Sequence, residues 1–93
     1  LVVPKQETDY IFNLDPALLG DLFRFAQRVA RAIESAIPCK RVGIGVLGLE
    51  VPHAHIHLIP MDTEGDMNLG RPVCKIPEQE MQRICRMIAQ KFE

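Results

Sequence analysis

The sequence lacks an excess of charge of either sign, since its 93 residues carry a net charge of −1 at pH 7. The basic residues are spread along the chain, so the electrostatic footprint of a nucleic-acid-binding protein is missing. No apolar stretch approaches the ~18 residues that a membrane span requires. A basic segment followed by an apolar one, as in a signal peptide, is also missing. These absences exclude nucleic acid and membrane as expected partners.

Cysteine is scarce as well: Cys39, Cys74 and Cys85 are odd in number and show no C-x-x-C spacing. This pattern excludes a disulfide framework and a zinc knuckle, and predicts reduced thiols, buried or half-buried, in a cytoplasmic protein. There is no internal repeat or low-complexity segment. With 47% apolar residues, the length fits a single domain over residues 1–93. Because Leu1-Val2-Val3-Pro4 reads as the end of a strand, we expect residues that precede it in the natural protein.

Two helices are predicted. Asp15 is a good N-cap with Pro16 at the first helical position, and an apolar stripe continues from residue 18 to residue 36 before Pro38 ends the helix. Arginines at 24, 28 and 31 fall outside this stripe and are expected on a solvated face. The second helix begins near Pro77 and carries an apolar stripe that we expect in the core: Met81, Ile84, Cys85, Ile88, Ala89 and Phe92.

Between the helices, residues 41–48 and the segment from residue 53 read as an antiparallel pair of strands. Gly43 and Gly45 share one face of the first strand, where glycine marks the close approach of a ligand or of other protein groups. Both interpretations stay open. Residues 61–76 are expected to form an irregular loop. The order of elements predicts an α+β fold with helices against an antiparallel sheet.

All three histidines lie in one window, His53-Ala54-His55-Ile56-His57. Roughly 89 of about 130,000 random placements would give this spacing. Because side chains alternate along a strand, the three imidazoles share one face and Ala54 and Ile56 take the other. Adjacent imidazoles would stand roughly 6–7 Å apart. The spacing suits a phosphate site or a metal site.

Three explanations of this row are open. His55 could attack phosphorus while its neighbours bind the phosphate oxygens, since a neutral imidazole is a good nucleophile near pH 7. Two or three imidazoles could instead bind a transition metal, although Glu50 is the only nearby acid. The row could also be purely structural.

The run from His53 to Ile59 resembles the His-φ-His-φ-His-φ-φ signature of the histidine triad (HIT) family of nucleotide hydrolases and transferases. Leu1-Val2-Val3-Pro4-Lys5 is similar to that family's strand ending in Pro-Lys, and Gly48 and Val51-Pro52 are similar to residues that precede its triad. The resemblance implies an antiparallel sheet with a long central helix and a C-terminal helix. It also implies a homodimer paired across the long helix and a strand, and a base pocket contributed by a segment before residue 1.

Residue by residue, the resemblance implies that His55 is the nucleophile toward the α-phosphorus and that His53 and His57 orient it and contact the phosphate. Glu50 stands where the family often has Ser or Thr near the leaving group, and is a candidate general acid or a solvated turn residue. Leu49 replaces a Gln, and Val42 replaces an Asn.

The resulting prediction is a HIT-type hydrolase or nucleotidyl transferase. It would act on phosphoramidate or phosphoanhydride bonds of a purine nucleotide or nucleotide conjugate, through a nucleotidyl intermediate on His55, with no metal or other cofactor. The alternatives are a nucleotide-binding module with weak or no catalysis, and a transition-metal-binding protein that uses His53, His55 and His57.

Overall fold

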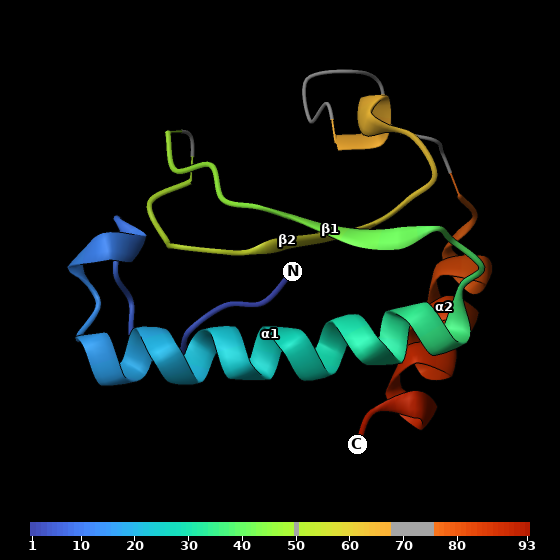
Figure 1. Cartoon of the computed structure of the whole chain (residues 1–93), viewed down its shortest axis with the longest axis horizontal. Coiled ribbons are helices and arrows are strands. Elements are labelled where there is room, and N and C mark those ends of the chain that lie inside the picture. Colours follow the sequence, from blue (N-terminus) through green and yellow to red (C-terminus); the bar gives the residue numbers. More distant parts are fainter. Residues whose placement is uncertain (50, 68–75) are drawn as a thin grey trace.

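The computed structural model describes residues 1–49, 51–67 and 76–93. Within these ranges the chain forms two α-helices, two strands and two short 3₁₀ helices, labelled η (Figure 1). Their bounds, in chain order, are η1 Ile11–Asn13, α1 Pro16–Ala36, β1 Arg41–Gly45, β2 His57–Met61, η2 Glu64–Met67 and α2 Glu78–Lys91. None of the described helices is both long and apolar enough to cross a membrane.

Helix α1 begins where the sequence predicts. The Asp15 side chain accepts a hydrogen bond from the Ala17 backbone N–H at 3.1 Å, and Pro16 occupies the first helical position. The helix ends at Ala36, and Pro38 lies two residues beyond. Its buried side chains follow one face: Leu22, Ala26, Ala32, Ile33 and Ala36.

Strands β1 and β2 pair antiparallel, which confirms the predicted pairing; Gly45 faces His57 and Gly43 faces Ile59 in the register. Val2 adds an isolated bridge on the other side, through hydrogen bonds with Ile56 of 2.8 and 2.9 Å in the two directions. This bridge fits the strand-like reading of the first residues. The three segments form an antiparallel layer.

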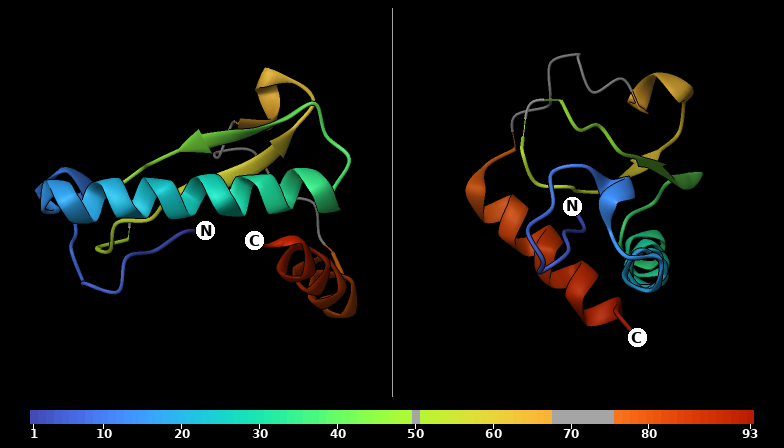
Figure 2. Two further views of the ribbon diagram at one scale, coloured as in Figure 1. Left: turned by 60° about the horizontal axis from the view of Figure 1, so that its bottom comes forward. Right: turned by 90° about the vertical axis from the view of Figure 1, so that its left-hand side faces the viewer.

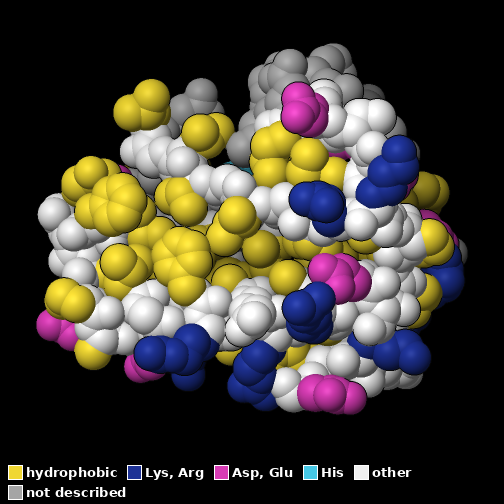
Figure 3. Space-filling view, in the orientation of Figure 1, with side chains coloured by type: hydrophobic (Ala, Val, Ile, Leu, Met, Phe, Trp, Pro, Cys, Tyr) yellow, Lys and Arg dark blue, Asp and Glu magenta, His cyan; other side chains and the backbone are white. Residues whose placement is uncertain are grey.

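Helix α1 covers one face of this layer, and η2 lies on the opposite face (Figures 1 and 2). The hydrophobic core lies on the α1 side of the layer and consists of Val2, Ile11, Leu14, Leu22, Ala26, Ala54 and Ile56. Apolar side chains are also exposed where α1 meets the strands (Figure 3). The layer therefore has a packed face toward α1 and an open face that η2 covers in part.

The two glycines of β1 are explained by packing. A methyl group built on Gly43 would overlap the Met61 sulfur and come within 2.5 Å of the Met67 methyl carbon, and one on Gly45 would lie 3.5 Å from the Met67 sulfur. The sequence left open whether a ligand or other protein groups approach these glycines, and the structure has protein groups there. Met61 of β2 and Met67 of η2 fill the space that a side chain on Gly43 or Gly45 would occupy.

Helix α2 starts at Glu78, as predicted, but its apolar stripe is not core. None of its residues is buried, Met81 is 52% exposed and Cys85 is exposed. Only Ile84, Ile88 and Phe92 of the predicted stripe are half-buried, and α1 is the helix against which α2 packs. Cys39 is half-buried, and Cys74 lies outside the described residues.

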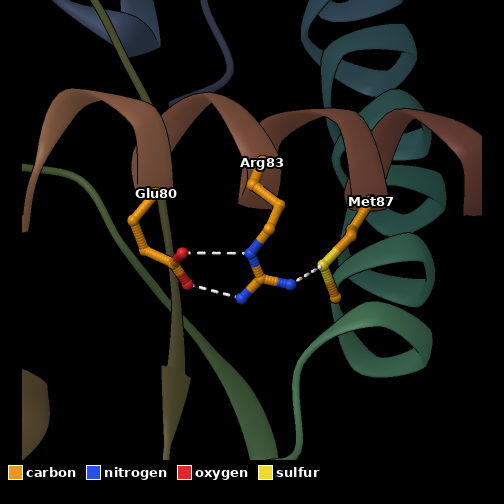
Figure 4. A network of polar contacts seen from close by, with 3 residues as sticks. All are labelled: Glu80, Arg83 and Met87. Carbon is orange, nitrogen blue, oxygen red and sulfur yellow. Dashed lines mark hydrogen bonds and ion pairs between the residues drawn. The ribbon is translucent and has the colours of Figure 1, made fainter.

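Arginines on both helices make polar contacts with neighbouring side chains or backbone. On α2, Arg83 bonds the Glu80 carboxylate and donates to the Met87 sulfur at 3.1 Å (Figure 4). On α1, Arg28 is exposed, as expected, and it also lies over the Phe92 ring, 4.5 Å from its centroid, and donates to the Glu93 carbonyl at 2.6 Å. Arg28 thus helps to join α2 to α1.

Candidate active site

The histidine row lies just before and at the start of β2. Only His57 is within the strand, while His53 and His55 precede it, so the prediction of one continuous strand is wrong in its bounds. The alternation of faces holds nevertheless. Ala54 and Ile56 are 2% and 0% exposed, because they pack in the core beneath α1, and the three histidines are half-exposed. Burial of the even-numbered residues therefore presents the imidazoles on the open face of the layer.

The tautomer of His55 follows from its hydrogen bond. Its Nδ1 lies 2.9 Å from the backbone carbonyl oxygen of His53. A carbonyl oxygen can only accept, so we assign the proton to Nδ1, which leaves Nε2 of the neutral ring with a free lone pair. A neutral imidazole with Nε2 unprotonated is a nucleophile or a general base.

His53 is fixed in a different way. Its Nε2 lies 3.0 Å from the backbone carbonyl oxygen of Pro4, so Nε2 carries the hydrogen and donates it. The neighbouring Ala54 N–H donates to the Thr8 carbonyl at 2.7 Å. Together these bonds attach the row to the N-terminal segment, and they orient the His53 carbonyl that accepts the hydrogen bond from His55 Nδ1–H.

His57 stacks edge-to-face with His55. The ring centroids are 4.8 Å apart with an interplanar angle of 70°, closer than the 6–7 Å expected from strand spacing, because the rings lean toward one another. Burial, and after it the proximity of His55, lowers the pKa of His57 below 6.5. His57 is therefore neutral at neutral pH.

The row is not arranged as a metal site. Among the described residues, no group of three histidine, cysteine or acidic side chains could hold a metal ion. One nitrogen each of His53 and His55 is engaged by a backbone carbonyl, and the opposite nitrogen of each ring is left open. The open nitrogen of His55 suits nucleophilic attack.

Three more residues near the row were singled out from the sequence: Val42, Leu49 and Glu50. Val42 is paired with Pro60, on the core face of the hairpin opposite to the histidines, so a polar residue there would not reach the row. Leu49 is fully exposed. Glu50 lies outside the described residues.

Two methionines on the open face were missed by sequence reasoning. Met61 and Met67 lie over the glycines of β1, and Gly45 is directly opposite His57. The alternating glycines were a signal that something approaches this face. Identifying the approaching residue required the fold, because Met67 comes from η2.

A separate apolar hollow of about 320 Å³ is lined by Ala54 but by none of the histidines. Around it lie large exposed side chains: Tyr10, Phe12, Phe23, Leu47 and Leu49. It is therefore distinct from the histidine site.

Comparison with known proteins gives consistent matches. The family model for the HIT domain matches residues 1–64. The bis(5′-nucleosyl)-tetraphosphatase (asymmetrical) of Schizosaccharomyces pombe is 34% identical over 65 residues, which is 64% of this chain and 36% of the relative. The chain thus spans about a third of the length of that relative.

Two solved structures resemble the whole fold. A histidine triad protein of Sinorhizobium meliloti has a TM-score of 0.79 and 28% identity, with 97% of this chain and 71% of that chain covered. A histidine triad protein of Bradyrhizobium japonicum has a TM-score of 0.78 and 28% identity, with 98% and 72% covered. The arrangement described above is therefore an α+β fold shared with histidine triad proteins.

Proposed function

The chain belongs to the histidine triad (HIT) family, and from this membership together with the geometry of the row we propose that it is a nucleotide hydrolase or nucleotidyl transferase. The substrates proposed are purine nucleotides linked through the α-phosphate to an amine or a second phosphate. The similarity to a dinucleoside tetraphosphatase and the free Nε2 of His55 beside the His57 ring support this proposal. We further propose that residues 1–93 form a single HIT domain.

One observation carries the mechanism: His55 Nδ1–H is held by the His53 carbonyl, which leaves Nε2 free. In the first step Nε2 attacks the α-phosphorus, a P–N bond forms, and the bond from phosphorus to the leaving oxygen or nitrogen breaks as the leaving group takes up a proton from solvent or from Glu50 as general acid. The ring becomes an imidazolium. Its Nδ1–H stays hydrogen-bonded to the His53 carbonyl oxygen, and this bond stabilises the positive charge. Water then attacks phosphorus and gives up a proton to solvent, the P–N bond breaks with its electron pair returning to Nε2, and the nucleotide and neutral His55 are released.

The other two histidines have supporting roles in this proposal. His53, predicted to orient His55 and to contact the phosphate, orients His55 through its own carbonyl and has its Nε2 bonded to Pro4, so a phosphate contact would use its other nitrogen. His57 lies against the His55 ring and offers a ring N–H to a phosphate oxygen. Glu50 stays a candidate general acid for the leaving group.

The deciding test is turnover of adenosine phosphoramidates and dinucleoside polyphosphates by wild-type protein and by His55→Ala. We expect the variant to lose at least about 1,000-fold in kcat. Stopping the wild-type reaction with alkali, in which a phosphoramidate survives, should reveal one nucleotidyl group on His55 by intact mass and peptide mapping. Full activity in a folded His55→Ala variant would exclude His55 as the nucleophile.

A nucleotide-binding module without efficient turnover is the second candidate. Leu49 supports it, because a fully exposed leucine occupies a position where the family resemblance implies a polar contact. This candidate predicts nucleotide binding by calorimetry with no adduct and no turnover.

We also propose that two copies pair across α1 and β1. Within the described residues, β1 is paired on one side only, so its other edge is free to bond a second chain. The exposed apolar side chains around the hollow, such as Phe23 and Leu47, lie on α1 and just after β1. A patch of this kind on a small domain marks an interface.

A further inference from the structure

The open face of the hairpin carries more than the histidines. In the register, Gly45 is opposite His57 and Gly43 is opposite Ile59, so these four residues share one face. This is the face on which η2 lies, away from α1 (Figure 1). The space beside His57 that a side chain of β1 would fill is therefore open to other groups.

Met67 fills this space. Its methyl carbon lies 2.5 Å, and its sulfur 3.5 Å, from the positions that side-chain carbons on Gly43 and Gly45 would occupy. Directly opposite residues of an antiparallel pair have Cβ atoms about 5 Å apart. The Met67 thioether therefore lies one strand away from His57, on the same surface.

The part of this surface next to His57 is apolar, and Arg41, paired with Met61, lies at its far end. Ile59 and Met61 continue the face of His57 along β2, and Met67 covers β1 beside them. A thioether is polarisable, adapts to the shape of its neighbour, and makes favourable contacts with aromatic rings. A phosphate bound at His55 and His57 would thus have an apolar wall on its β1 side.

We propose that Met67 is a specificity-determining residue: its thioether forms the wall beside His57 that receives an aromatic group attached to the bound phosphate. The proposal rests on the proposed function and names the class of leaving group. Nucleotide conjugates whose leaving group is aromatic are preferred over those whose leaving group is small and hydrophilic. Met67 touches this group and takes no part in the bond changes at phosphorus.

Two ligands test the wall: adenosine 5′-phosphoramidate with a free amino group, and the same compound carrying a phenyl group on that nitrogen. Dissociation constants are measured by calorimetry in the His55→Ala background, where turnover does not interfere. Replacing Met67 by Ala should weaken binding of the phenyl compound about fivefold and change binding of the amino compound less than twofold. Met67→Leu, which keeps an apolar wall, should stay within about twofold on both.

Met81→Ala is the matched control, because Met81 is exposed on α2, outside the site. If Met67→Ala fails to fold, Met67→Gln keeps the length of the side chain and should show the same selective loss. Equal weakening of both ligands, or no change in either, would overturn the proposal. Turnover by protein with His55 intact is measured separately. Selective binding without turnover would contradict the proposed hydrolase activity but would still support the proposed role of Met67.

Discussion

The three imidazoles of the row differ in what holds them. His53 and His55 each donate a hydrogen bond to a backbone carbonyl, whereas His57 is placed by its own strand and by the His55 ring. A backbone carbonyl fixes a tautomer without adding a charge, so the unprotonated Nε2 of His55 depends on the path of the chain at His53. The chemistry proposed for His55 is therefore set by main-chain geometry.

The lowered pKa of His57 gives a prediction for stability. Unfolded protein binds a proton at His57 near pH 6.5, and the folded protein binds it only at lower pH. The unfolded state then carries more protons between these values, so the free energy of unfolding decreases as the pH falls below about 6.5. We expect His57→Gln to lose less stability than wild type between pH 7.5 and 5.5, as measured by urea unfolding. Parallel pH profiles would contradict this assignment.

The glycines of β1 give a second prediction at this scale. Gly43→Ala should destabilise the protein by about 1–3 kcal/mol, because the new methyl group overlaps Met61 and crowds Met67. Gly45→Ala is the matched control. Its methyl group would be in ordinary contact with Met67, so we expect a change below about 1 kcal/mol. Equal losses of stability in urea unfolding would contradict the packing explanation.

At the scale of elements, the two helices were predicted with different success. The start of α1 is encoded locally by Asp15 and Pro16, so the sequence suffices to place it. The stripe of α2 also predicts a helix, but a stripe does not say how much of it a partner covers. The helix packs against α1, yet Met81 and Cys85 remain exposed.

That contact yields a prediction for α2. Phe92 packs on Phe25 with ring centroids 5.5 Å apart and lies under Arg28. Phe92→Ala should lower stability by about 1–3 kcal/mol and speed hydrogen exchange in α2 more than in α1. Met81→Ala, in the same helix, should change stability by less than about 0.5 kcal/mol. Unchanged exchange in α2 would show that the aromatic contact does not hold it.

At the scale of the whole molecule, the site could be predicted only in part. The histidine spacing and the alternation of faces are sequence properties, and they identified the row. The carbonyl of Pro4 and the thioether of Met67 could not be inferred, because each comes from a segment that only the fold brings beside the row. Glu50 lies outside the described residues, so its predicted role stays a prediction.

The apolar surface near the hollow leads to a prediction about assembly. If two copies pair across α1 and β1, Leu47→Glu should convert a dimer into a monomer, since Leu47 is 57% exposed and charge is unfavourable in an interface core. Light scattering coupled to size exclusion measures the mass. Met81→Glu, on α2, should leave the dimer intact. A wild-type monomer, or a dimer that tolerates Leu47→Glu, would contradict the pairing.

The bond from His53 to Pro4 has a consequence for folding kinetics. It joins residues 49 positions apart, and the Val2–Ile56 bridge beside it spans a similar separation. Closing so long a loop costs chain entropy before any contact repays it, whereas α1 forms from neighbours in sequence. We expect the histidine row to become ordered late, after α1. The proposed nucleophile would then be assembled by one of the last steps of folding.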